Sequence, residues 1–208
     1  MKILVIGATR GIGLQLVQQA LEGGHSVTAL VRKPGNPIDD PQLRVVGGDI
    51  LQAQTVEEAM AGQDVVCSTI GVKAGRGPIT VFSEGIRNVI GAMKKHDVPR
   101  LENVSGIGAG DSRNHGGFFY DKLLFPLLMK RIYEDKDRQE EIIRASDVDW
   151  VIVRPGFLTN GAFTGDYRVV TKLDGVRARR ISRTDVAHFI LEQLRSRKYL
   201  RQTPLVTG

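Results

Sequence analysis

The sequence predicts an α/β fold in which a doubly wound parallel sheet is flanked by helices. One observation is a regular alternation of short apolar segments with longer segments of helical periodicity, which is typical of parallel strands joined by right-handed crossovers. Another is that the first of these short segments is a continuous run of β-branched and aliphatic residues, as expected for a strand covered by helices on both faces. A chain of 208 residues is also long enough to bury a substantial core.

The elements follow one another closely from the start of the chain. The first strand is predicted at 2–6, and a helix begins at Gly11 and ends before the pair Gly23-Gly24. The further elements, in chain order, are strand 26–31, strand 43–46, helix 55–61, strand 64–69, helix 80–96, strand 101–104, helix 133–145, strand 150–153 and helix 183–194.

The last third of the chain is less regular. Two short strands are predicted there, at 167–171 and 204–207. Ser182 is the predicted N-cap of the last helix, and Asp185 stands in its first turn, where a negative charge is favourable.

Composition and charge argue against several classes of function. No apolar run approaches the roughly 20 residues that span a bilayer, and the N-terminus does not look like a signal peptide, so no membrane partner is expected. The net charge is +6, but basic residues are spread along the chain, which favours a small anionic ligand over nucleic acid. A single cysteine, Cys67, suits a reducing cytoplasm, and the four histidines show no metal-ligand spacing.

The first strand leads directly into a glycine-rich turn that opens a helix. In a doubly wound sheet, ligands bind beyond the carboxyl ends of the strands, where the strand order reverses. The first glycine allows the tight turn, the second lets backbone approach a pyrophosphate, and the third lets helix and strand pack closely. The turn therefore predicts a Rossmann-type NAD(P)-binding site, with a glycine turn that binds no ligand as the alternative. Its predicted cofactor contacts are Gly7, Ala8, Thr9, Arg10, Gly11, Ile12 and Gly13.

The end of the second strand indicates which dinucleotide binds. An NAD site needs a carboxylate there for the ribose 2′-hydroxyl, but this strand ends in Arg32-Lys33 and the next acid is Asp39. A guanidinium can bind a 2′-phosphate through two charge-assisted hydrogen bonds, and Arg10 can supply a second cation. We therefore predict NADP(H) as the cofactor, with Arg32 and Lys33 among its contacts. A solvated loop is the alternative interpretation of these two residues.

Several stretches together resemble the atypical short-chain dehydrogenase/reductase superfamily, in its NAD(P)H-binding group that lacks the usual active-site tyrosine. They are the glycine turn 7–13, Val31-Arg32, Gly48-Asp-Ile50 and Arg154-Pro-Gly156. Within that group, residues 46–52, 61–64 and 83–88 are similar to biliverdin-IXβ reductases, which are also flavin reductases. The resemblance covers nearly the whole chain, is closest over 1–105 and thins around 106–130.

The resemblance implies further cofactor contacts, each at the carboxyl end of a predicted strand. Asp49 and Ile50 are implied to contact the adenine, with turn capping as the alternative role of Asp49. Ser105 is implied to lie near the nicotinamide, with capping of the following loop as its alternative. The backbone groups of three further residues are also implied to contact the cofactor, namely Thr69, Ile70 and Gly71. A last segment is implied to close over the nicotinamide ring, and it consists of Pro155, Gly156 and Phe157.

Most short-chain reductases carry Tyr-x-x-x-Lys, in which the tyrosine donates a proton and the lysine lowers its pKa. Counted back from Arg154, Lys136 matches the register of that lysine, and the tyrosine position holds Ile132. Tyr133 is one residue late, about 100° around the helix, and is expected to point elsewhere. Ser105 and Lys136 are therefore the candidate catalytic residues, with a solvated surface charge as the alternative for Lys136.

The missing tyrosine argues against ketone chemistry. It favours delivery of hydride from NADPH to a planar conjugated acceptor of the flavin, bilin or quinone type, which solvent can protonate. The glycine- and aromatic-rich segment 116–126 is predicted to be a lid or wall that stacks on such a substrate, or else to pack on the sheet or on a second subunit. It belongs to a smaller substrate-side region, about 106–130 and 155–180, of a single domain spanning 1–208.

Two other functions stay open at this point. One is an NADP(H)-binding redox sensor that does not turn over. The other is an epimerase using bound NAD, which Arg32 and the missing tyrosine disfavour. The expected partner is a small planar substrate, either neutral or anionic. Binding to nucleic acid or to a membrane is not expected. The chain is expected to be a monomer or a small homo-oligomer.

Overall fold

The computed structural model is built around one large sheet and describes residues 1–33, 38–72, 77–113, 115, 117 and 129–208. The strands of this sheet are β1 (Lys2–Ile6), β2 (Ser26–Val31), β3 (Leu43–Gly47), β4 (Val65–Ser68), β5 (Arg100–Val104), β6 (Asp149–Pro155), β8 (Arg168–Val170) and β10 (Leu205–Thr207). The predicted lid segment 116–126 lies outside the described residues, except for Gly117.

The strand order is β3-β2-β1-β4-β5-β6-β10-β8. Neighbouring strands are parallel, except that β8 runs antiparallel to β10. The order reverses between β1 and β4, because the chain first builds outward from β1 through β2 to β3 and then from β4 in the other direction. This confirms the predicted doubly wound parallel sheet and locates its switch point beside the glycine turn.

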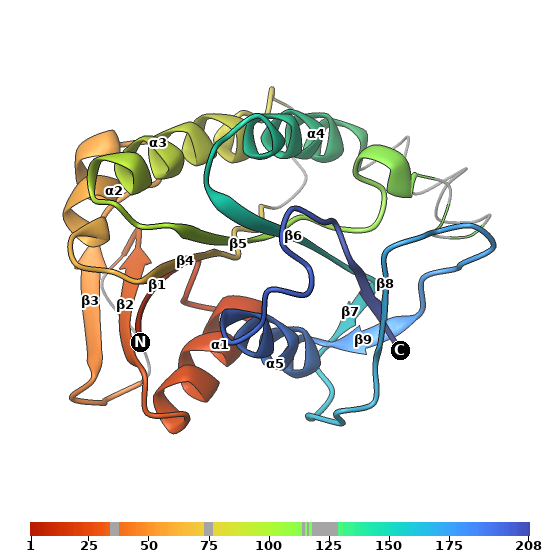
Figure 1. The fold of residues 1–208 in the computed structure, drawn as a ribbon, viewed down its shortest axis with the longest axis horizontal. Coiled ribbons are helices and arrows are strands. Elements are labelled where there is room, and N and C mark those ends of the chain that lie inside the picture. The colour runs from red at the N-terminus through yellow and green to blue at the C-terminus, as the bar shows by residue number, and fades with distance from the viewer. Residues whose placement is uncertain (34–37, 73–76, 114, 116, 118–128) are drawn as a thin grey trace.

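Helices cover both faces of the sheet. They are α1 (Gly11–Glu22), α2 (Ala53–Met60), α3 (Val81–Lys95), α4 (Lys130–Arg144) and α5 (Arg183–Leu194), with a short 3₁₀ turn, η1 (Gly110–Ser112). Figure 1 shows α2, α3 and α4 on one face and α1 and α5 on the other. No helix within the described ranges is long and apolar enough to cross a membrane.

The two layers explain why β1 is apolar at each position after Lys2. Ile3 and Val5 pack into the core cluster on the α1 and α5 side, whereas Leu4 and Ile6 pack into the cluster on the other side. All four are buried, and burying such a side chain contributes about 1.5–3 kcal/mol. The strand is therefore held at the centre of the sheet from both faces.

The structure moves several predicted boundaries and adds two strands. α4 begins at Lys130, earlier than predicted, and β8 and β10 correspond to the strands predicted at 167–171 and 204–207. Ser182 is confirmed as the N-cap of α5, since its hydroxyl accepts the Asp185 N–H at 2.9 Å. The parallel pair β7 (Phe157–Thr159) and β9 (Arg180–Ser182) was not predicted.

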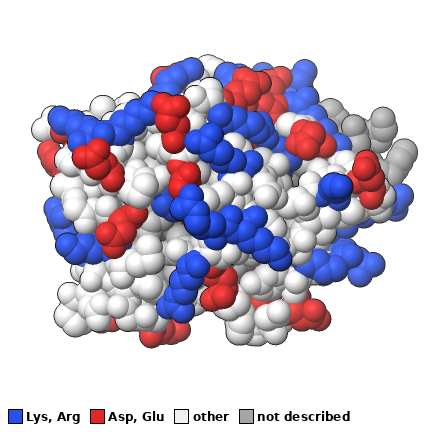
Figure 2. All heavy atoms as spheres, viewed as in Figure 1, with Lys and Arg blue, Asp and Glu red and all other residues white. Residues whose placement is uncertain are grey.

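Charged side chains cover much of the outer surface. Figure 2 shows several groups of Lys and Arg side chains on the face seen in Figure 1, with acidic side chains between them. Among the described residues, no three His, Cys, Asp or Glu side chains gather as metal ligands would.

Candidate functional site

A cavity of about 800 Å³ lies over the switch point of the sheet. The predicted site residues in its wall are Gly7, Ala8, Thr9, Arg10, Gly11, Ile12, Arg32, Asp49, Ile50, Thr69, Ile70, Gly71, Ser105 and Lys136. Those absent from the wall are Gly13, Lys33, Pro155, Gly156 and Phe157. The structure thus brings together residues from the ends of β1, β2, β3, β4 and β5 and from α4.

The glycine turn has a backbone that few other residues could adopt. Gly7 and Gly11 have φ values of +90° and +63°, in the left-handed region. A Cβ on Gly13 would clash with the Gly7 carbonyl oxygen and the Thr69 hydroxyl, and would lie 2.8 Å from the Gly7 carbonyl carbon. The Thr69 hydroxyl donates to the carbonyl oxygens of Ile6 at 3.0 Å and Gly7 at 3.3 Å. Gly13 therefore does not line the cavity, and its role is to let α1 pack closely on the sheet.

The N-terminus of α1 faces the cavity without a side-chain cap. Its N-cap residue, Arg10, is extended and makes no capping hydrogen bond within the described part of the chain, and the first turn holds no acid. The N-terminus of α5, in contrast, is capped by Ser182 and has Asp185 in its first turn. The first-turn N–H groups of α1 are thus suited to an anionic ligand.

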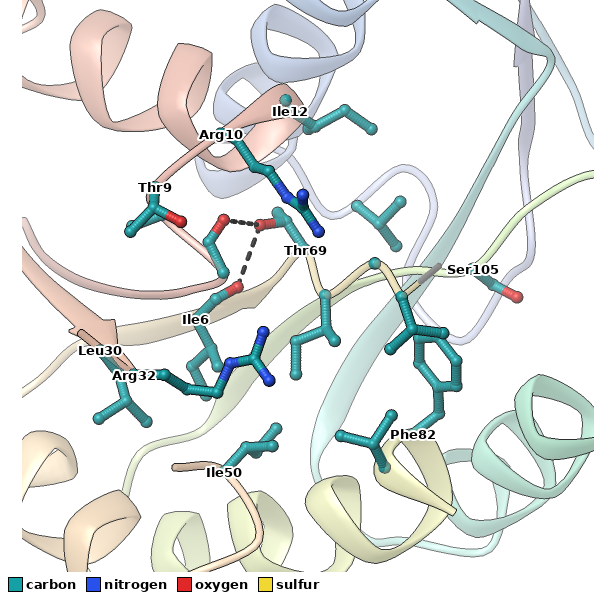
Figure 3. Close-up of a pocket in the computed structure, with 18 of the residues that line it drawn as sticks. Ile6, Thr9, Arg10, Ile12, Leu30, Arg32, Ile50, Thr69, Phe82 and Ser105 are labelled. Carbon is teal, nitrogen blue, oxygen red and sulfur yellow. Dashed lines mark hydrogen bonds between the residues drawn. The ribbon is translucent and has the colours of Figure 1, made fainter. Parts of the chain in front are cut away.

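Two arginines border the cavity, Arg10 from within the glycine turn and Arg32 from the end of β2. Figure 3 shows the Arg10 and Arg32 side chains extending toward the same space, from the residue before α1 and from the end of β2. Both are exposed, and neither forms an ion pair with any described residue. Lys33 is exposed and stands outside the wall. Asp49 lines the cavity and also caps its own turn, because its carboxylate accepts the Leu51 N–H at 3.0 Å.

Lys136 lies at the α4 end of the cavity and is buried, so the solvated-charge interpretation is wrong. Its ammonium group donates to the Ser105 carbonyl oxygen at 2.8 Å and stands 4.7 Å from the centre of the Phe82 ring. Burial lowers the pKa of Lys136 to about 8, although the carboxylates of Glu140 and Asp135 raise it.

Ser105 also lies at the α4 end of the cavity, and it is the first residue after β5. Figure 3 shows its hydroxyl turned away from the other labelled residues. The group that the structure brings to Lys136 is therefore the main-chain carbonyl of Ser105 rather than its hydroxyl.

Tyr133 lies in the cavity wall beside Ile132, so the expectation that it points elsewhere is wrong. Its hydroxyl oxygen would be 2.8 Å from a Cβ placed on Gly106. The reason is that α4 buries adjacent rows of side chains rather than a single stripe. Its buried residues are Ile132, Tyr133, Asp135, Lys136, Gln139, Glu140 and Ile143. A rotation of one residue does not take a side chain off so wide a face.

A buried ion pair fixes how α4 sits on the sheet. The Arg154 guanidinium on β6 donates to both carboxylate oxygens of Glu140, at 3.1 and 2.6 Å, and to Asp111 at 2.5 Å. Burial alone would raise the pKa of Glu140, but the hydrogen bonds and charge of Arg154 outweigh it and the pKa lies below its usual range. Because Lys136 is one turn from Glu140, this pair also sets the position of Lys136.

The segment 155–157 does not border the cavity. The Phe157 side chain packs against a separate cluster that contains Ile107, Ala178 and Leu205. A Cβ on Gly156 would clash with the Arg179 carbonyl oxygen, where the chain between β6 and β7 passes β9. Close packing of the two backbones therefore accounts for a glycine at position 156. The prediction that residues 155–157 close over the nicotinamide ring finds no support in the described cavity wall.

The wall residues that sequence reasoning missed include Leu158, Asn160 and Arg183. They come from β7, from the residue after it and from the start of α5. Short strands and a lone arginine after an N-cap serine carry no sequence signal for a ligand site, so only the fold brings these residues to the cavity.

A switch-point cavity with an open glycine turn and an uncapped helix N-terminus defines a Rossmann-type dinucleotide-binding protein. The chain belongs to the NAD(P)H-binding family, which it matches over residues 7–197. The resemblance to the atypical short-chain dehydrogenase/reductase superfamily that was stated from the sequence is confirmed.

Among curated proteins, the chain is 31% identical to a chloroplastic protein of Arabidopsis thaliana over 203 residues, which cover 93% of this chain and 71% of that protein. It is 28% identical to the uncharacterized sugar epimerase YhfK of Bacillus subtilis, over 93% of this chain and 88% of YhfK.

Among solved structures, the chain is similar to ChuY, an anaerobillin reductase from Escherichia coli O157:H7. The TM-score is 0.82 at 23% identity, over 100% of this chain and 97% of ChuY. A short-chain dehydrogenase/reductase from Veillonella parvula in complex with NADP also gives a TM-score of 0.82, at 19% identity, over 100% of this chain and 94% of that one. At these identities the likeness concerns the fold.

Proposed function

We propose that this protein is an NADPH-dependent reductase that delivers hydride to a planar conjugated acceptor of the flavin, bilin or quinone type. The observation that carries the proposal is the pair Arg10 and Arg32, which reach into the cavity at the end of β2, where an NAD-specific site would have a carboxylate. The NADP complex of the Veillonella protein and the bilin chemistry of ChuY support it by analogy of fold.

The residues present fit such a cofactor along the length of the cavity. Arg10 and Arg32 would hold a 2′-phosphate, and the first-turn N–H groups of α1 would hold the pyrophosphate. Lys136 fixes the end of β5 through the Ser105 carbonyl, and we assign Lys136 and Ser105 to this end of the site as positioning groups. A bound dinucleotide would supply the hydride. The protein's part is to orient the reactants and exclude water.

The acceptor end of the cavity is apolar. Its wall there includes Val72, Phe82, Met129 and Ile132, with Tyr133 and Lys136 as polar groups beside them. An apolar wall with a few polar groups suits a flat conjugated ring system with polar substituents. We further propose the cytoplasm as the location, a single domain with a substrate-side region at about 106–130 and 155–180, and a monomer or small homo-oligomer.

The test is NADPH oxidation, followed through loss of nicotinamide absorbance, with riboflavin, FMN, a quinone and biliverdin as acceptors. We expect turnover with at least one of them and much slower turnover with NADH. Tight NADPH binding without turnover of any acceptor would favour the redox sensor instead. Purification with NAD retained in the protein would favour the epimerase, the activity in the name of YhfK.

Tyr133→Phe asks whether the hydroxyl in the cavity wall donates a proton during flavin reduction. We expect kcat with riboflavin to stay within about threefold of the parent, because solvent can protonate a reduced flavin without a general acid. Removal of a working general acid would instead lower kcat by about a hundredfold or more. The comparison should include a ketone substrate and an unfolding curve, since Tyr133 is buried and its loss of packing must be separated from a loss of chemistry.

A further inference from the structure

Arg183, the first residue of α5, lies over the glycine turn. Its Nε and Cδ atoms are 3.6 and 3.7 Å from the position that a Cβ on Gly11 would take, and its side chain lines the cavity. Because α1 and α5 pack side by side on one face of the sheet (Figure 1), the start of α5 brings this cation next to the uncapped first turn of α1.

No described residue around Arg183 neutralises its charge through an ion pair. Other arginines that lose solvent are paired, such as Arg100 with Glu102 at 2.6 Å and Arg154 with Glu140 at 2.6 Å. Arg183 is half-buried, and within the described ranges it takes part in no ion pair. Partial burial of an unpaired cation is unfavourable, and an anion in the cavity would offset that cost.

A neutral side chain holds Arg183 in this position. The Arg183 guanidinium donates to the Asn160 side-chain oxygen at 2.7 Å. The neighbouring Thr184 hydroxyl donates to Gln15 on α1 at 3.1 Å, and the Gln19 side chain donates to the Thr184 carbonyl oxygen at 3.0 Å. The start of α5 is thereby attached to α1, and Asn160 orients the guanidinium without cancelling its charge.

We infer that Arg183 binds the diphosphate of the dinucleotide from beside the glycine turn, and that Asn160 is its positioning residue. The inference rests on the proposed function, and it assigns Arg32 and Arg183 to different phosphate groups of the cofactor. Arg32 recognises the 2′-phosphate, which only NADP(H) carries, whereas Arg183 binds the diphosphate common to NADP(H) and NAD(H).

Two nucleotide fragments separate these tasks. ADP has a diphosphate but no 2′-phosphate, and 2′-AMP has a 2′-phosphate but no diphosphate. By calorimetry, Arg183→Gln is expected to weaken ADP binding by about tenfold to a hundredfold and to leave 2′-AMP within about twofold, because charge-assisted contacts to the diphosphate are lost. The matched variant Arg32→Gln is expected to do the reverse.

A double-mutant cycle tests the role of Asn160. Asn160→Ala should weaken ADP binding severalfold when Arg183 is present and have no effect in the Arg183→Gln background, because Asn160 acts through that guanidinium. Unfolding curves of the variants check that the fold is kept.

Unchanged ADP affinity in Arg183→Gln overturns the inference. Equal weakening of both fragments together with a lower Tm also overturns it, since a purely structural role would do this. Weaker binding of the acceptor with ADP unchanged would assign Arg183 to an anionic substrate instead. If the parent binds ADP but not 2′-AMP, the NADP preference of the proposed function fails, while loss of ADP binding in Arg183→Gln still supports the inference.

Discussion

Gly13→Ala is expected to lower the free energy of unfolding by at least about 3 kcal/mol, the upper part of the range for an overpacked site. The added methyl group would clash with the Gly7 carbonyl oxygen and the Thr69 hydroxyl. Neither group can move easily, because Gly7 forms the tight turn and Thr69 donates to the Ile6 and Gly7 carbonyls. To admit the methyl group, α1 would have to move away from the sheet and separate the core that it shares with β1.

Gly91→Ala is the matched control, since Gly91 is also a helical glycine and receives the same methyl group. Gly91 is exposed on α3, and a Cβ there would have no atom of a described residue outside its own turn within 4 Å. This variant should gain about 0.5–1 kcal/mol from the better helix propensity of alanine. In thermal unfolding without cofactor, Gly13→Ala should lower Tm by about 6–12 °C. Equal Tm values for the two variants would contradict the packing role of Gly13.

The central sheet could be predicted because its signals are local. Each central strand is a short apolar run, and the glycine turn follows the first of them directly. β7 and β9 gave no such signal, because each has three residues and the two pair only after an excursion of the chain between them. Their pairing depends on the tertiary fold, and with it the positions of Leu158 and Asn160 in the cavity wall.

The polar appearance of α4 concealed how deeply it is buried. The Asp135 carboxylate is fully buried and accepts the Phe82 N–H at 2.9 Å, at the start of α3. Gln139 exchanges hydrogen bonds with Asn103 on β5, at 3.2 and 3.1 Å. A charged helix with its partners on other elements looks solvated in the sequence alone, which is why a solvated charge was the alternative for Lys136. Tyr133 was misplaced for another reason, because one narrow buried stripe was assumed for a helix that buries a wide face.

Family resemblance identified several residues of the cavity wall, but it also named positions that lie outside the wall. Positions at the ends of β1, β3 and β4 follow from the turn geometry that this fold requires, and there Thr69 and Ile50 line the cavity. The motif that begins at Arg154 is explained by other contacts, since Arg154 pairs with Glu140 and Gly156 lies against Arg179, the residue before β9. The motif can be recognised in the sequence, but its role depends on contacts with residues that are distant in the chain.

The cofactor preference is expected to depend on Arg32 more than on any other side chain. Arg32→Ala should remove most of the preference for NADPH, because a charge-assisted bidentate contact is worth about 1.5–3 kcal/mol. Arg32→Asp should reverse it, because a carboxylate repels the 2′-phosphate and can accept the ribose 2′-hydroxyl of NADH. The ratio of the two Kd values should then change by about a hundredfold to a thousandfold relative to the parent.

Lys33→Asp is the matched control for Arg32→Asp, since it makes the same change of charge one residue further along the chain. Arg32 lines the cavity and Lys33 does not, so Lys33→Asp should alter the Kd ratio by no more than about threefold, through screened long-range charge alone. Calorimetry with NADPH and NADH on the four proteins decides the point. Equal affinities in the parent would remove the basis for NADP(H). An equal effect of both aspartate variants would show that net charge, rather than the position of the Arg32 guanidinium in the cavity wall, sets the preference.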